Sequence, residues 1–150
     1  MISNGLPIHS PDVNQCANFI KSALHTCNSN HVRCNSDSLV HGSTGGNVSN
    51  FVPKRLLYIG SNQAADRIRL YESENGASSS DRSGLQYAAL SHCWGELQIV
   101  RTTQASLSEF LTSGISWSAL STTFKDAISI AREIGMEYIW IDSLCKTHRL

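Results

Sequence analysis

The stretch Thr122–Asp142 constrains the fold more than any other part of the sequence, because two periodicities meet in it. Five apolar side chains recur at i, i+3, i+4, i+7 and i+10, the spacing of one helix face: Phe124, Ala127, Ile128, Ala131 and Ile134. Gly135 stands where a glycine commonly ends a helix, and the apolar run Tyr138–Ile141 follows almost at once. The stretch therefore predicts an amphipathic helix, a tight turn and a buried strand.

The segment before this helix predicts a second strand. "LQYAALSHCW", Leu85 to Trp94, is typical of a mostly buried strand, so the order strand, helix, strand predicts a βαβ unit with a right-handed crossover. An unbroken apolar strand suits a parallel sheet that is covered on both faces. We expect an α/β fold with a partial parallel sheet and a βαβ core. In such a sheet Tyr138–Ile141 would be central, and a free edge there would favour aggregation.

The first half of the chain predicts a helix and a β-hairpin ahead of that core. Ser10 as N-cap and Pro11 at the first helical position predict a helix over residues 11–26. Residues 35–50 are rich in Gly and Ser and are typical of a flexible loop. Residues 55–59 and 68–71 are short strand candidates that could pair as a hairpin, followed by a second flexible stretch over 72–84.

Two further patterns concern the ends of helices. Leu107, Phe110 and Leu111 predict a short helix that Gly114 ends. At the start of the later helix, Thr123 and Asp126 have the spacing of a capping box, and Thr122 is a rival cap.

Composition and charge exclude several classes of protein. The 12 Lys and Arg balance 12 Asp and Glu, which argues against a nucleic-acid partner and against electrostatic anchoring to a membrane. No apolar run is long enough to cross a bilayer and no signal peptide is recognisable, so we expect a cytoplasmic protein. The odd number of cysteines, 5, then favours reduced thiols. No glycine-rich phosphate loop occurs, so no cofactor is predicted.

Cys27, His31 and Cys34 are the candidate metal ligands. They lie within eight residues just past the predicted helix, and zinc takes about four Cys or His ligands. Cys16 precedes them by three helical turns. The spacing is not that of a standard zinc knuckle, and Cys16 and Cys27 also fit the apolar helix face as small core residues. We therefore assign no metal and keep this group as a weak candidate.

Ser91, His92 and Asp142 are the candidate site residues of the βαβ core. In parallel sheets ligands bind beyond the carboxyl ends of the strands, where all three would fall, so they could share a crevice. The alternative is that Asp142 caps the next segment or binds backbone N–H groups. Ser91 and His92 are adjacent and should point to opposite faces of a strand, which argues against a catalytic triad. Cys145 could equally be buried and inert.

Two blocks of sequence, "YAALSHCWG" and "TTFKDAISIAREIGMEYIWIDSLC", resemble the HET (heterokaryon incompatibility) domain of fungal proteins. The "C…H..C", "PKRLLYIG" and "RIRLYE" segments resemble its usual lead-in. The matching signature positions of unknown role are Ser91, His92, Trp94, Gly95, Asp142 and Cys145.

The resemblance implies the following organisation and function. Residues 1–50 would be a helix and flexible loop, 51–84 a hairpin and Ser-rich linker, 85–145 the first part of a HET domain and 146–150 a divergent tail. The family pattern continues with Ile-x-Gln-Asp, whereas this chain has Lys146–Leu150, so we expect a truncated domain. The family acts in fungal non-self recognition and programmed cell death, through protein partners or self-association.

The resemblance also bears on possible enzyme activity. HET domains are distantly similar to TIR domains, which have a flavodoxin-like sheet, and some TIR domains cleave NAD with a glutamate. That glutamate would lie beyond Cys145, so we assign no catalytic residue, and NAD cleavage would belong to the full domain. The alternatives are an inactive fragment or decoy interaction module, and a small zinc-binding module.

Overall fold

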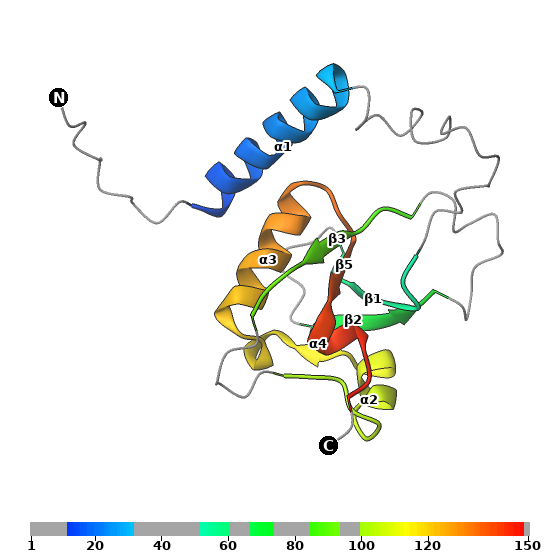
Figure 1. Cartoon of the computed structure of the whole chain (residues 1–150). Helices are drawn as coiled ribbons and strands as arrows, with labels where there is room; N and C mark the ends of the chain where they lie inside the picture. Colours follow the sequence, from blue (N-terminus) through cyan, green and yellow to red (C-terminus); the bar gives the residue numbers. More distant parts are fainter. Residues whose placement is uncertain (1–11, 32–51, 61–66, 74–84, 94–99, 149–150) are drawn as a thin grey trace, which may run out of the picture.

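A computed structural model describes residues 12–31, 52–60, 67–73, 85–93 and 100–148, and its centre is a mixed five-stranded sheet (Figure 1). The strands lie in the order β3-β5-β1-β2-β4. The elements are α1 (Val13–Asn30), β1 (Arg55–Tyr58), β2 (Arg67–Glu72), β3 (Ala88–Leu90), α2 (Leu107–Thr112), β4 (Ile115–Ser116), the 3-10 helix η3 (Trp117–Ala119), α3 (Thr122–Glu133), β5 (Tyr138–Ile141) and α4 (Asp142–Cys145). The α/β class is confirmed.

The predicted parallel sheet is correct for only one pair of strands. β3 and β5 are parallel, with Ala89 opposite Trp140. β1 lies on the other side of β5 and pairs with it antiparallel, and it also forms the predicted hairpin with β2. The expectation of an uncovered β5 edge is therefore wrong, because the hairpin supplies the strand that satisfies its backbone groups.

The two predicted buried strands are each less buried than expected. In β5 only Ile139 and Ile141 are buried, while Tyr138 and Trp140 on the opposite face are half-buried. β3 is three residues long and has no fully buried residue, whereas the sequence predicted a buried strand over 85–94. In the described part of the sheet β3 is an edge strand, so one side of it has no strand partner. An edge position explains both its shortness and its exposure.

α3 carries the predicted apolar stripe, but the predicted caps are wrong. Ser121 is the N-cap, and its Oγ accepts a hydrogen bond from the Phe124 N–H at 3.3 Å. Thr122 and Thr123 are already inside the first turn. The stripe, including Phe124 and Ile128, is buried against the sheet in the main hydrophobic core.

One charged residue of α3 is also buried. Arg132 is 7% exposed, and its guanidinium donates two hydrogen bonds to the Ile59 carbonyl, at 2.9 and 2.7 Å. It also lies over the Trp117 ring at 5.4 Å. Burial lowers the pKa of Arg132, although a guanidinium still remains charged at neutral pH. This side chain joins α3, η3 and the end of β1.

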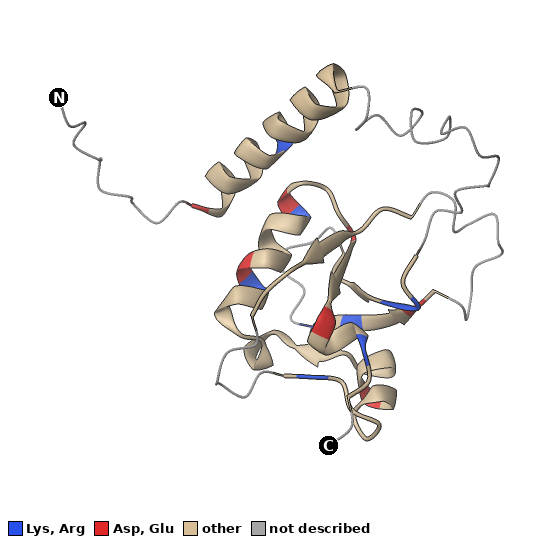
Figure 2. Cartoon of the chain, viewed as in Figure 1, with Lys and Arg blue, Asp and Glu red and all other residues tan. Residues whose placement is uncertain are grey.

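α1 packs against α3 through its N-terminal half, where Ala17 is buried. The helix begins at Val13 with Asp12 as N-cap, rather than at Pro11, and it runs to Asn30, past the predicted end. Its remaining surface is mostly exposed, and Phe19 is 75% exposed. None of the described helices is long and apolar enough to cross a membrane. Figure 2 shows the Lys, Arg, Asp and Glu positions distributed along several of the described helices and strands.

Candidate functional site

A pocket of about 320 Å³ opens at the carboxyl ends of the parallel strands β3 and β5. Because Leu90 lies opposite Ile141, the residues that follow each strand emerge at the same end of the sheet. Six residues line it: Ala89, Leu90, Ser91, His92, Trp140 and Asp142. The structure therefore brings Ser91, His92 and Asp142 into one crevice, as the strand-end argument predicted.

His92 lies between this pocket and the core. Its ring meets that of Phe124 edge-on, with centroids 5.0 Å apart and an interplanar angle of 88°. Both ring nitrogens are buried, and neither has a hydrogen-bond partner in the described part of the chain. Buried polar atoms are usually paired, so a partnerless imidazole beside a pocket is a feature that a ligand's polar group could satisfy.

Ser91 is exposed beside His92, and both residues line the same pocket. The strand ends at Leu90, before both residues, so strand alternation does not govern the directions of their side chains. The argument against a triad nevertheless holds. Because the ring nitrogens of His92 have no partner among the described residues, His92 bonds neither to Ser91 nor to Asp142, as a triad requires.

Asp142 is the first residue of α4, and its carboxylate is held by a lysine. The Lys146 Nζ lies 2.6 Å from Asp142 Oδ1, an i,i+4 ion pair whose side chains are 60% and 30% exposed. The same ammonium lies 5.4 Å from the Trp140 ring centroid. The N-cap of α4 is Ile141 and has no side-chain cap bond, so the alternative in which Asp142 caps the next segment is wrong.

Cys145 is a structural residue of this region rather than a reactive one. It is 5% exposed, and its sulfur accepts a hydrogen bond from the Ile141 N–H at 3.4 Å. Desolvation by burial raises the pKa of the Cys145 thiol to about 12. Burial therefore favours the neutral thiol near pH 7, and the neutral thiol is a poor nucleophile.

Sequence reasoning missed the residues that hold α4 in place. Thr102 is fully buried, its Oγ1 donates to the Leu144 carbonyl at 2.6 Å, and its N–H donates to the Ser143 carbonyl at 2.9 Å. Thr147 Oγ1 accepts from Arg55 at 2.7 Å. The tail up to His148 is thus ordered against the sheet. The Asp142–Lys146 spacing was a usable signal for the ion pair, because i,i+4 charges meet on a helix.

The remaining candidate residues lie partly outside the described part of the chain. Trp94, Gly95 and Cys34 lie outside the described residues. Cys27 Sγ and His31 Nδ1 lie 3.4 Å apart at the end of α1. Cys16 lies three turns earlier on that helix. Within the described residues, no group of three or more His, Cys, Asp or Glu side chains could hold a metal ion.

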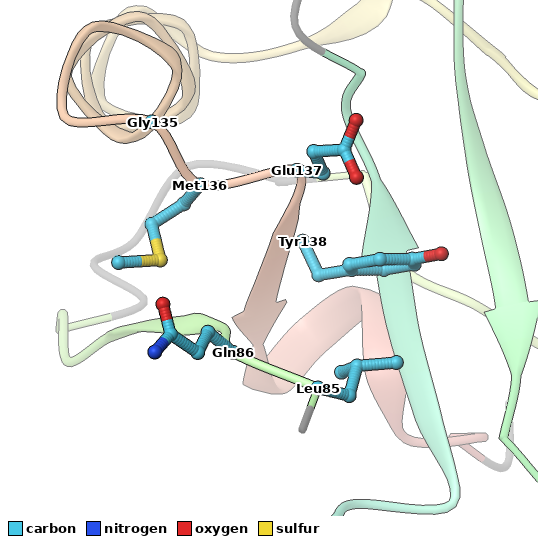
Figure 3. Close-up of a pocket in the computed structure, with 6 residues that line it drawn as sticks. All are labelled: Leu85, Gln86, Gly135, Met136, Glu137 and Tyr138. Carbon is cyan, nitrogen blue, oxygen red and sulfur yellow. The ribbon is translucent and has the colours of Figure 1, made fainter. Parts of the chain in front are cut away.

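Two further pockets lack the chemistry of the first. One of about 250 Å³ lies at the amino end of β5, and Gln86 and Met136 are among the residues that line it (Figure 3). Glu137 is the only ionisable side chain in that lining apart from Tyr138. Another, of about 420 Å³, lies between α1, α3 and β3, and Thr123 is its only polar side chain. The pocket with Ser91, His92 and Asp142 is therefore the candidate functional site.

Fold and site together define an α/β protein with a crevice where two parallel strands end, in which Ser91, His92 and Asp142 lie among apolar side chains. In comparisons with known proteins, the family model described as "Heterokaryon incompatibility protein (HET)" matches residues 87–148. This confirms the resemblance to the HET family over that segment, which runs from just before β3 to just after α4. No curated protein and no solved structure matches the chain. The expected similarity to TIR and flavodoxin-like folds is therefore not supported by a match to any solved structure.

Proposed function

We propose that this chain acts in fungal heterokaryon incompatibility, as a protein of non-self recognition whose activation stops growth or kills the cell. One observation carries the proposal. All six residues that line the candidate site fall inside the segment that matches the HET family, residues 87–148. Three of the signature positions, Ser91, His92 and Asp142, line that pocket, and a pocket with convergent polar groups is the default binding-site hypothesis.

The pocket suits recognition better than bond cleavage. It offers a serine hydroxyl, an imidazole without a partner, an indole and a carboxylate already paired with lysine. These groups can donate to, accept from and stack on a bound molecule. They lack the hydrogen-bonded base that activates a nucleophile. The proposed role is therefore to bind a ligand or partner that switches the response on.

Inducible expression of the whole chain in a filamentous fungus tests the proposed function. We expect hyphal growth to stop and a membrane-impermeant dye to enter the cells after induction. The control is Ile139→Asp, which places a charge at a position that is 2% exposed in the core and should prevent folding. Growth equal to that of the empty vector, at matched wild-type protein level, would overturn the proposal. So would equal killing by Ile139→Asp, because the effect would not need the fold.

A further inference from the structure

An ammonium group of the chain itself lies at one corner of the candidate site. Lys146 Nζ is 2.6 Å from Asp142 Oδ1 and 5.4 Å from the centroid of the Trp140 ring. A carboxylate and the face of an indole ring are two groups that bind organic cations in proteins. Asp142 and Trp140 both line the pocket of about 320 Å³, whereas Lys146 is not among its lining residues. The lysine therefore shows which kind of group this corner accepts.

The lysine satisfies the carboxylate only in part. Asp142 Oδ1 is buried, and in the described part of the chain it makes an ion pair with Lys146 but no hydrogen bond. The Lys146 side chain is 60% exposed, and an ion pair with so exposed a partner is held weakly. A cation that also donated a hydrogen bond to this oxygen would bind it better. The contact is therefore one that a ligand can replace.

The rest of the pocket suits a ligand with an apolar body and a cationic end. Ala89 and Leu90 supply apolar lining, and Asp142 is the one carboxylate among the six lining residues. The ring nitrogens of His92 are buried and have no hydrogen-bond partner among the described residues, and a neutral imidazole can accept a hydrogen bond. An ammonium carries N–H donors and no acceptor, which matches a corner that offers two acceptors.

We propose that the pocket binds a small organic ammonium ion with an apolar body, and that Lys146 occupies the cation position until such a ligand displaces it. The inference rests on the proposed function, because it names the ligand class of the pocket to which recognition is assigned there. Two cations on one carboxylate oxygen repel each other, so the ligand replaces Lys146 rather than joining it. Lys146 is thus an internal competitor that raises the ligand concentration at which the site fills.

The volume of the pocket favours a free amine over a lysine side chain of a partner protein. About 320 Å³ lies within the range of sites for small molecules. A partner's lysine would bring the same cation on a thin stem and would leave much of this volume unfilled. An amine that carries a ring or a branched apolar group fills it.

The test compares an amine with the alcohol of the same shape, using the whole chain labelled for nuclear magnetic resonance. Phenethylamine, which is an ammonium ion at neutral pH, and phenethyl alcohol are titrated separately, and the indole N–H signals report binding. We expect the amine to bind at least about tenfold more tightly, because a hydrogen bond to a charged group contributes more than a neutral one. The Trp140 signal should shift most, and added salt should weaken binding of the amine alone.

Matched variants decide whether the lysine and the carboxylate are responsible. Lys146→Ala should tighten amine binding by up to about fivefold, the contribution of a partly exposed ion pair, and leave binding of the alcohol unchanged. Asp142→Asn should weaken the amine to the level of the alcohol. Lys21→Ala and Asp126→Asn remove the same charges at exposed positions that do not line the pocket, and should bind the amine as the wild type does. Urea denaturation should show a cooperative transition in all four.

Four results would contradict this inference and leave the proposed function standing. Equal affinity for amine and alcohol, or amine binding unchanged in Asp142→Asn, excludes a cation position at Asp142. Amine affinity that does not rise in Lys146→Ala shows that the lysine does not compete. Tighter binding of a lysine with both ends blocked than of phenethylamine identifies the ligand as a lysine side chain of a partner protein. Selective amine binding by a chain whose expression leaves hyphal growth unchanged would instead support this inference and contradict the proposed function.

Discussion

Burial decides what the two ends of α4 can do chemically. At its start, Asp142 is half-exposed in the pocket and pairs with Lys146 at 2.6 Å, so it can exchange partners with a ligand. At its end, Cys145 is 5% exposed among apolar side chains, and this burial raises the pKa of its thiol. The two signature residues therefore have different roles, one facing a site and the other supporting it.

The pH dependence of stability tests the role of Cys145. Burial raises its pKa from 9.0 to about 12, so above about pH 9 the unfolded chain loses a proton that the folded protein keeps. Its contribution is fully present below about pH 9 and falls by up to about 1.4 kcal/mol per pH unit above it. We expect the free energy of unfolding in urea to fall more steeply between about pH 8 and pH 10.5 in the wild type than in Cys145→Ala. Parallel curves for the two proteins would contradict a buried, neutral thiol.

A strand-end rule was enough to place Ser91, His92 and Asp142 together, because the carboxyl ends of parallel strands share one edge of a sheet. The contacts of these side chains could not be predicted in this way, because they involve residues that are distant in the sequence. The His92 ring packs edge-on against Phe124 of α3, which lies more than thirty residues further along the chain. The support of α4 by Thr102 depends on a loop whose sequence carries no periodic signal.

At the scale of elements, two glycines end helices but differ in their surroundings. Gly114 follows α2 with φ +77°, and a Cβ there would lie 2.5 Å from the Ile68 carbonyl oxygen of β2. Gly135 follows α3 with φ +88°, and nothing lies within 4 Å of such a Cβ. The first glycine allows α2 and β2 to approach, whereas the second only turns the chain.

The matched substitutions Gly114→Ala and Gly135→Ala separate these two roles. Both should lose about 1–2 kcal/mol because an L-residue is strained at positive φ. Gly114→Ala should lose at least about 1 kcal/mol more, because its Cβ overlaps a backbone atom that cannot move freely. Urea denaturation of both variants measures the difference. Equal losses would show that the close approach of Gly114 to β2 is not tight.

Hydrogen exchange tests the placement of β5 between two strands. β5 pairs with β3 on one side and β1 on the other, whereas β3 has one strand partner in the described sheet. We expect the amides of β5 and β1 to be among the slowest to exchange, and those of β3 to exchange much faster, because edge strands open by local fluctuations. Mass spectrometry of fragments after deuterium labelling measures this. Exchange in β5 as fast as in β3 would argue that the hairpin does not cover it.

The positions of the helices and strands can be predicted from local sequence patterns, but the pairing of the strands cannot. Tyr138–Ile141 was predicted with its observed bounds, since an apolar run between a glycine turn and an acid is a local signal. That β1 would pair with β5 is a contact between residues about eighty positions apart, and periodicity carries no information on it. The cap of α3 was predicted at Thr123, or at its rival Thr122, instead of Ser121, because three consecutive Ser and Thr side chains could each serve.

At the scale of the whole molecule, the sheet is one structure built from both halves of the chain. β1 and β2 come from residues 55–72, ahead of the matched segment, and they complete the sheet on which β3 and β5 lie. The core likewise includes Leu57, Ile68 and Leu70 from the hairpin with Ile139 and Ile141 from β5. The candidate site therefore depends on the hairpin for its support, although the hairpin contributes no residue to it.

The fraction of dead hyphal cells after induction of single-site variants tests most directly whether this pocket carries the response. Asp142→Asn and His92→Phe change two of its lining residues, and Asp126→Asn changes an exposed acid on α3 as a matched control. All three should keep the wild-type free energy of unfolding to within about 1 kcal/mol. The Asp142–Lys146 ion pair is partly exposed, Asp126 is an exposed surface residue, and the His92 ring nitrogens have no described hydrogen bond to lose. We predict that Asp142→Asn and His92→Phe lower cell death to the level of the empty vector while Asp126→Asn kills as the wild type does. Undiminished killing by both pocket variants, at equal protein level, would contradict the assignment of the site.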